Sequence, residues 1–147
     1  WCNGIFNGFS PWKENQKVDF SIPEERKKWL CKVAVMNIKK SGGPGNSDFS
    51  QLESAVKESI GLIKKEIQII GPDIIVACGT YYFLSEIIYE NDPDSEKGSL
   101  INGVDYTINH RENWLIVDFY HPAARVRANF LYTMLMDTVK EAIKIIK

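Results

Sequence analysis

The chain has only two histidines, and one of them, His121, directly follows an apolar segment of strand length. Residues 114–120 are typical of a buried strand, and His121-Pro122 ends that strand abruptly. Open α/β sheets bind ligands in the crevice outside the carboxyl ends of their strands. An imidazole placed there can stabilise negative charge developing on a substrate oxygen or can transfer a proton. We therefore take His121 as the candidate catalytic residue. The alternative is a purely structural histidine.

A second apolar segment ends in Asn37 and is followed by two lysines and a glycine-rich loop. The amide of Asn37 offers two donors and an acceptor, so it can recognise the edge of a nucleobase. The alternative is an amide that ties down the backbone of the next loop. Lys39 and Lys40 are candidates for binding phosphate, whereas solvated surface lysines are the simpler interpretation.

Gly79-Thr80 stands at a third junction, between an apolar segment and a helix. Free N–H groups and the helix dipole favour an anion at such a junction, although the Thr80 hydroxyl is equally explained as a helix cap. Arg125 and Arg127 lie where the last helix is expected to begin, and cations are unfavourable at that end of the dipole. Their placement points to an anionic partner, with a solvated Arg127 as the alternative.

These candidates need a scaffold of alternating strands and helices. Apolar runs predict three buried strands, at 32–38, 73–79 and 114–120. Helical spacing and caps predict helices at about 22–30, 48–70, 80–89 and 126–146. Residues 1–21 have no clear pattern, and a short helix at about 2–8 is one interpretation of them. The rest is expected to be loop at 41–47 and 91–98, with a small hairpin over 101–110 around Asn102-Gly103.

Strands that alternate with amphipathic helices predict parallel βαβ units. The expected fold is one domain over 1–147, a three-layer α/β/α sandwich with a mainly parallel sheet. Right-handed crossovers place the carboxyl ends of all three strands on one edge. We therefore expect Asn37, Gly79-Thr80 and His121 to meet there.

Composition limits the classes of function. The chain has 147 residues, 44% of them hydrophobic and 25% charged, as in a globular domain, and a formal net charge of −1. That charge provides no global attraction for nucleic acid. Cys2, Cys31 and Cys78 lack the spacing of a metal site or disulfide framework. No apolar stretch approaches the ~18 residues of a membrane span. We expect a cytoplasmic protein without metal, cofactor or membrane partner.

Taken together, the three strand ends resemble those of the uracil-DNA glycosylase superfamily. Val33 to Asn37 resembles its base-recognising strand, Ile74 to Thr80 a later strand ending in Gly-Ser or similar, and Leu115 to Arg125 its His-Pro-Ser loop. The order and spacing agree over roughly residues 30–147. The chain also resembles an uncharacterised bacterial branch of the superfamily, through Asn37-Ile38-Lys39-Lys40, Pro72-Asp73-Ile74-Ile75 with Cys78-Gly79-Thr80, and His121-Pro122-Ala123 with Arg125.

The resemblance implies a DNA-repair hydrolase that flips a uracil or another deaminated base out of single- or double-stranded DNA and cleaves its N-glycosidic bond. It implies that Asn37 binds the base edge and that His121 stabilises the uracil anion. It also implies that Thr80 contacts a phosphate and that Arg125 fills the vacated place in the stack.

Two departures from the superfamily bear on activity. Ala123 replaces the usual serine, and the superfamily's first motif, a central strand and the loop with its water-activating residue, is absent. Without it, the strands at 32–38 and 73–79 would face a gap with unpaired backbone groups. We expect the motif upstream of Trp1, in a chain that is truncated at its N-terminus; the alternative is that another segment or chain fills the gap. Asp118 is a poor substitute base if its side chain points into the sheet. The alternatives are a non-catalytic nucleic-acid or nucleobase binder on the same scaffold and a flavodoxin-like small-molecule domain.

Overall fold

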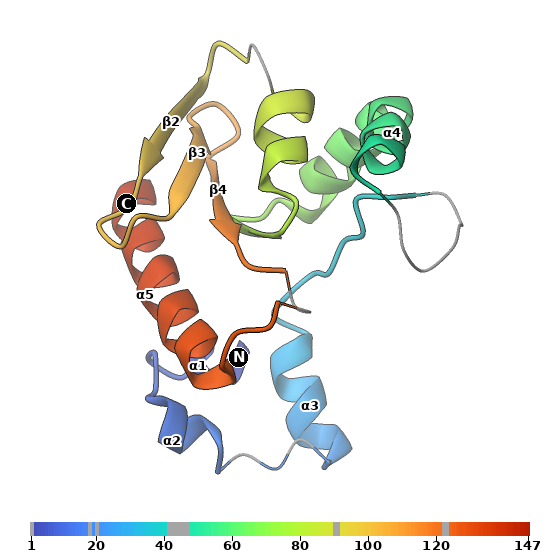
Figure 1. Ribbon diagram of the computed structural model, residues 1–147. Helices are drawn as coiled ribbons and strands as arrows, with labels where there is room; N and C mark the ends of the chain where they lie inside the picture. The colour runs from blue at the N-terminus through green and yellow to red at the C-terminus, as the bar shows by residue number, and fades with distance from the viewer. Residues whose placement is uncertain (1, 18, 20, 41–47, 90–91, 122–123) are drawn as a thin grey trace.

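The computed structural model describes residues 2–17, 19, 21–40, 48–89, 92–121 and 124–147, and it shows a mixed α/β fold around one open sheet (Figure 1). The four strands are β1 (Ile74–Cys78), β2 (Ser95–Ser99), β3 (Asp105–Asn109) and β4 (Trp114–Phe119). Their order in the sheet is β1-β4-β3-β2. β1 and β4 are parallel, whereas the β4–β3 and β3–β2 pairs are antiparallel. The sheet is therefore mixed, not mainly parallel as expected from the sequence.

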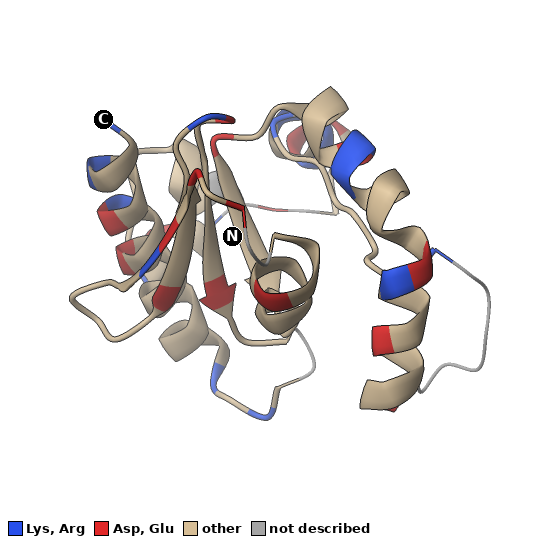
Figure 2. Ribbon diagram, turned by 90° about the horizontal axis from the view of Figure 1, so that it is seen from above, with Lys and Arg blue, Asp and Glu red and all other residues tan. Residues whose placement is uncertain are grey.

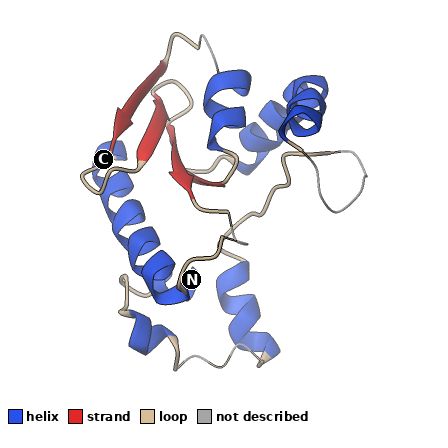
Figure 3. Cartoon of the chain, viewed as in Figure 1, coloured by secondary structure: helices blue, strands red, loops and turns tan. Residues whose placement is uncertain are grey.

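Helices make up most of the rest of the described chain (Figure 3). They are α1 (Cys2–Phe6), α2 (Trp12–Asn15), α3 (Pro23–Leu30), α4 (Phe49–Ile70), the π-helix η1 (Phe83–Ile88) and α5 (Ala128–Ile146). The predicted ends of the long helix are confirmed. Asp48 accepts a hydrogen bond from the backbone N–H of Gln51 at 2.8 Å, and Gly71, with φ of 56°, ends α4 in the left-handed conformation that glycine adopts most easily.

Strand β4 lies at the centre of the core because both of its faces are covered. Leu115, Ile116 and Val117 have no exposed surface. Ile116 packs in a cluster with residues of α4 and η1, whereas Leu115 and Val117 face a cluster that includes Ala142 of α5. This burial on both faces explains why residues 114–119 form a continuous apolar run.

The N-terminal helices are anchored to α5 through Tyr132. Its side chain is 1% exposed, its hydroxyl donates a hydrogen bond to the carbonyl of Ser10 at 2.5 Å, and its ring packs at 5.2 Å from that of Trp12. The residues before α3, which the sequence left largely unassigned, therefore contribute to the packing of α5.

The predicted strand at 32–38 is wrong. Residues 33–37 have no regular structure and pair with no strand among the described residues, and Val35 is 92% exposed. Only Ile38 of this segment is buried in the core, with Met36 packed partly against it. A strand needs a hydrogen-bonding neighbour, and the described residues place none beside this segment.

The other predicted elements differ less from the structure. The turn at Asn102-Gly103 is confirmed, with the N–H of Gly103 donating to Leu100 at 2.9 Å, but its hairpin is longer and includes β2 within the predicted loop 91–98. The helix expected at 80–89 is mainly the π-helix η1. The last helix begins at Ala128 rather than at 126. The predicted loop 41–47 lies outside the described residues, as do Pro122 and Ala123.

Among the described residues, no helix combines the length and the apolar character that crossing a bilayer requires.

Candidate functional site

Gly79 and His121 lie in contact at the carboxyl ends of the parallel strands β1 and β4. The register pairs Cys78 with Phe119, and the N–H of Gly79 donates to the carbonyl of Phe119 at 2.7 Å. A Cβ atom at position 79 would lie 3.0 Å from the Cβ and 3.5 Å from the Cδ2 of His121. The predicted meeting of these two strand ends is therefore confirmed. We call Gly79, Thr80 and His121 the rim.

The rim requires glycine at position 79 for two independent reasons. Its φ of 69° is left-handed, and a Cβ at this position would crowd the Cβ of His121. Thr80 is half-buried, and its carbonyl accepts the N–H of Leu84 at 3.3 Å, so the chain turns from the strand into helix here. Both observations agree with the strand-to-helix junction expected from the sequence.

A backbone hydrogen bond links His121 to Ala124. The carbonyl of His121 accepts the N–H of Ala124 at 2.8 Å, and His121 is exposed. Arg125 is exposed and lies before α5, while Arg127 is the N-cap residue of that helix. The two arginines therefore lie just before the positive end of α5 and close in sequence to the rim.

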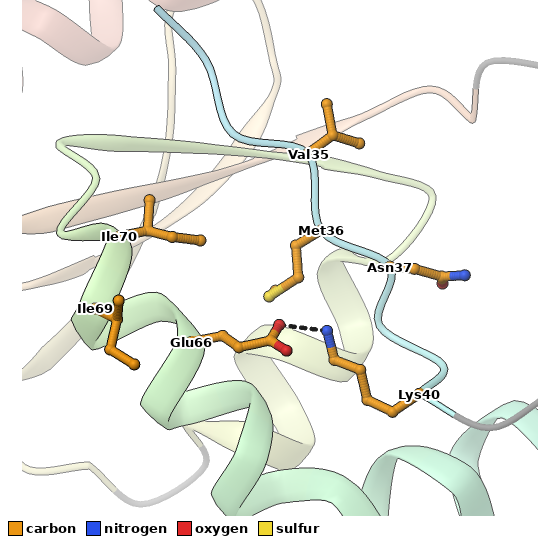
Figure 4. Close-up of a pocket in the computed structure, with 7 residues that line it drawn as sticks. All are labelled: Val35, Met36, Asn37, Lys40, Glu66, Ile69 and Ile70. Carbon is orange, nitrogen blue, oxygen red and sulfur yellow. Dashed lines mark hydrogen bonds and ion pairs between the residues drawn. The ribbon is translucent and has the colours of Figure 1, made fainter. Parts of the chain in front are cut away.

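Asn37 and Lys40 line a pocket beside α4, with a volume of about 370 Å³ (Figure 4). Its other lining residues are Val35, Met36, Glu66, Ile69 and Ile70. Figure 4 shows the side chain of Asn37 directed away from the pocket and Lys40 ion-paired with Glu66. Asn37 Oδ1 accepts the N–H of Lys39 at 3.2 Å, which is the loop-fixing role given above as the alternative.

Asn37 therefore does not stand at the end of a strand as expected, and Lys39, which is half-buried, belongs to the same irregular segment. The reason is that residues 33–37 join no strand, so the sheet does not determine where Asn37 lies. The structure thus brings two of the three predicted strand ends together, with the side chain of His121 against Gly79, and the third follows a separate path along α4.

Polar groups that the sequence did not single out lie close to the rim along the chain. Tyr81 follows Thr80, and its hydroxyl is 2.9 Å from Thr107 Oγ1 on β3. Burial raises the pKa of the Tyr81 phenol and that of the Cys78 thiol. Cys78 therefore stays protonated and is a poor nucleophile. The sequence analysis missed Tyr81, and the signal that could have identified it is its position just after the strand-to-helix junction at Gly79-Thr80.

Asp118 is exposed, so its side chain does not point into the core of the sheet. Partial burial, and then the negative charge of Asp105 on the neighbouring strand, raise the pKa of Asp118. A raised pKa is a property of a general base that works near neutral pH. Asp118 was expected to be a poor substitute base if its side chain pointed into the sheet, and its exposure removes that objection.

Within the parts of the chain that the structure describes, no three His, Cys, Asp or Glu side chains are grouped so that they could hold a metal ion. Comparison with known protein families, curated proteins and solved structures finds no match for this chain. Its function therefore has to be inferred from the rim itself.

Proposed function

We propose that this chain is a uracil-DNA glycosylase-like protein that hydrolyses the N-glycosidic bond of uracil or another deaminated base in DNA. The observation that carries the proposal is the contact between Gly79 and His121 at the carboxyl ends of two parallel strands. In this proposal the domain is a three-layer α/β/α sandwich of the superfamily's kind. The partner is DNA, and no metal or cofactor takes part.

In the proposed reaction the bond between the base and C1′ of the deoxyribose breaks, and its electron pair stays on the base. His121 stabilises the resulting anion, as a donor placed where charge develops. Water then attacks C1′ and loses a proton to a carboxylate. Asp118, exposed and three residues before His121, is our candidate for that carboxylate.

Other candidate residues would bind the remaining parts of the substrate. Thr80 would contact a phosphate at the start of its helical turn, and Arg125 would fill the place of the flipped base. Asn37 and the lysines Lys39 and Lys40 would contact the base edge and its neighbouring phosphates, which requires their segment to close over the rim.

The test is formation of abasic sites in DNA that contains uracil or hypoxanthine, single- or double-stranded. Removing one donor that stabilises developing charge costs about 10²–10³-fold in rate, so His121→Ala should lose activity to that extent. His110→Ala is the matched control, because His110 lies at the end of the hairpin with its Nε2 3.3 Å from Glu96. Absence of abasic product with every base, or equal rates for His121→Ala and wild type, would contradict the proposal.

A non-catalytic nucleic-acid or nucleobase binder is the second candidate. It is favoured by the placement of Asn37, which no strand holds at the edge of the sheet with His121. This alternative predicts binding without cleavage. The binding should weaken with salt and with Arg125→Ala or Lys39→Ala.

A further inference from the structure

Four cations are concentrated on α3 and the turn that follows it. Arg26, Lys27, Lys28 and Lys32 lie within seven residues and are all exposed, and we call them the α3 basic surface. The two acids of this helix, Glu24 and Glu25, stand in its first turn, where they complement the helix dipole. The rest of α3 and its C-terminal turn is therefore positive.

These cations differ in their partners from several other lysines of the described residues. Those lysines pair with nearby acids, as in Lys57–Glu53, Lys97–Glu86 and Lys144–Glu141, each at 2.6 Å. Figure 2 shows this mixture of signs along α4 and α5. Within the described ranges, the structure gives no ion pair to any member of the α3 basic surface. Its charge is thus not neutralised by neighbouring acids.

Aromatic rings hold two of the ammonium groups in place. Lys28 Nζ lies 4.7 Å from the centroid of Trp29, and Lys32 Nζ lies 5.1 Å from the same ring and 5.1 Å from that of Phe6. Cation–π contacts orient an ammonium group without cancelling its charge. Two like charges are thereby kept at one indole, an arrangement that an anion would stabilise.

The position of α3 leaves this surface open. The helix lies at one end of the molecule with α1 as its main packing partner, and Trp29 is its only buried residue (Figure 1). A membrane-surface helix needs a broad apolar face. On α3 the exposed large apolar residue is Leu30, which lies among the cations, so the helix presents no such face.

We propose that the α3 basic surface binds the sugar–phosphate backbone of a nucleic acid. Backbone phosphates form a row of anions that several cations contact together, and binding releases condensed counterions. The net charge of the chain is −1, so this attraction is local to α3. The proposal goes beyond the base site, because it requires neither a deaminated base nor His121.

The test measures binding of the whole chain to labelled oligonucleotides that contain no deaminated base, as single-stranded DNA and as RNA of equivalent sequence. For single strands each phosphate contact contributes roughly 0.7 to the slope of log K against log salt, so four contacts contribute about 3. The variant Arg26→Gln/Lys27→Gln/Lys28→Gln/Lys32→Gln should lose most of that slope and bind at least about tenfold more weakly.

Two variants keep the test clear. Arg26→Gln/Lys27→Gln leaves the aromatic contacts intact and should lose about half of the slope. Lys97→Gln/Lys144→Gln removes the same charge from ion-paired positions and should bind like wild type. Because the oligonucleotides contain no deaminated base, the proposed reaction at the rim cannot contribute to the signal, which separates this proposal from the glycosylase. Equal salt slopes for wild type and the α3 variants would overturn the proposal, as would binding to phosphatidylserine vesicles without binding to either nucleic acid.

Discussion

Gly79 lies against the side chain of His121 where the carboxyl ends of β1 and β4 meet. A Cβ at residue 79 would lie 3.0 Å from the Cβ of His121, closer than most real Cβ contacts, and 3.5 Å from the imidazole Cδ2. Because the two residues belong to different strands, the contact depends on the parallel pairing of β1 with β4. The position of the histidine is therefore a property of the sheet and not of its loop alone.

Gly79→Ala should disturb both the backbone and the rim. A left-handed backbone costs a non-glycine residue about 1–2 kcal/mol, and here the new methyl group also meets His121. Gly71→Ala is the control, since Gly71 has φ of 56° but open space around it. Urea unfolding should show the cost of the left-handed backbone in both variants. Only Gly79→Ala should also lose the proposed glycosylase activity, measured as formation of abasic sites. Equal losses of stability and unchanged activity would show that the contact has no role.

Asp118→Asn should change how stability depends on pH. The raised pKa means that folded Asp118 binds its proton more tightly than unfolded Asp118. The free energy of unfolding of the wild type therefore falls as pH rises from the ordinary value of 3.8 through the folded pKa. Asn cannot ionise, so the variant should gain stability relative to wild type at neutral pH and lose that advantage in acid. Urea midpoints at neutral and acidic pH measure this difference, and the same difference at both values would refute it.

Tyr89 should make the protein sensitive to alkali. Burial, with smaller contributions from Glu112 and Asp92, raises the pKa of Tyr89 to about 12, and its ring packs 4.5 Å from that of Trp114. Unfolded tyrosine ionises near its ordinary value of 10, so the free energy of unfolding should fall as pH rises from there toward 12. Tyr89→Phe keeps the ring and should reduce this fall. Denaturant midpoints of wild type and Tyr89→Phe across that pH range measure the effect. The same pH profile for both proteins would contradict the prediction.

Val35→Lys tests the correction to the predicted first strand. With Val35 at 92% exposure, the substitution should change the free energy of unfolding by no more than about 0.5 kcal/mol. Ile116→Ala, in a strand residue without exposed surface, should cost about 2–5 kcal/mol. Chemical denaturation compares the two. A cost for Val35→Lys as large as that for Ile116→Ala would mean that residues 33–37 are a buried strand after all.

Sequence reasoning succeeded where the cause of a structure is local. Asp48 and Gly71 mark the ends of α4 through hydrogen bonds and dihedral angles of their own neighbourhood. The turn at Asn102-Gly103 is likewise a property of a few residues. β4 was predictable because burial on both faces leaves a continuous apolar run.

Sequence reasoning failed where the structure of a segment depends on a partner far along the chain. Residues 32–38 have strand-like composition, yet the described part of the chain provides no neighbouring strand for them. Residues 33–37 are therefore irregular, and the place of Asn37 changes with them. Conversely, β2 has the sequence Ser-Glu-Lys-Gly-Ser, which carries no apolar alternation, and it forms because the turn brings it against β3. The contact of Gly79 with His121 was foreseen because topology rules for parallel strands are independent of side-chain detail.

The most direct test of the rim as a base-binding site is the NMR signal of the His121 imidazole during titration with an oligonucleotide that contains uracil. We predict a shift of the His121 ring signals that saturates with the oligonucleotide, that is much smaller with the matching thymine oligonucleotide, and that His110 does not share. His121 signals that stay unchanged at saturating oligonucleotide, or that shift equally with uracil and thymine, would contradict the account.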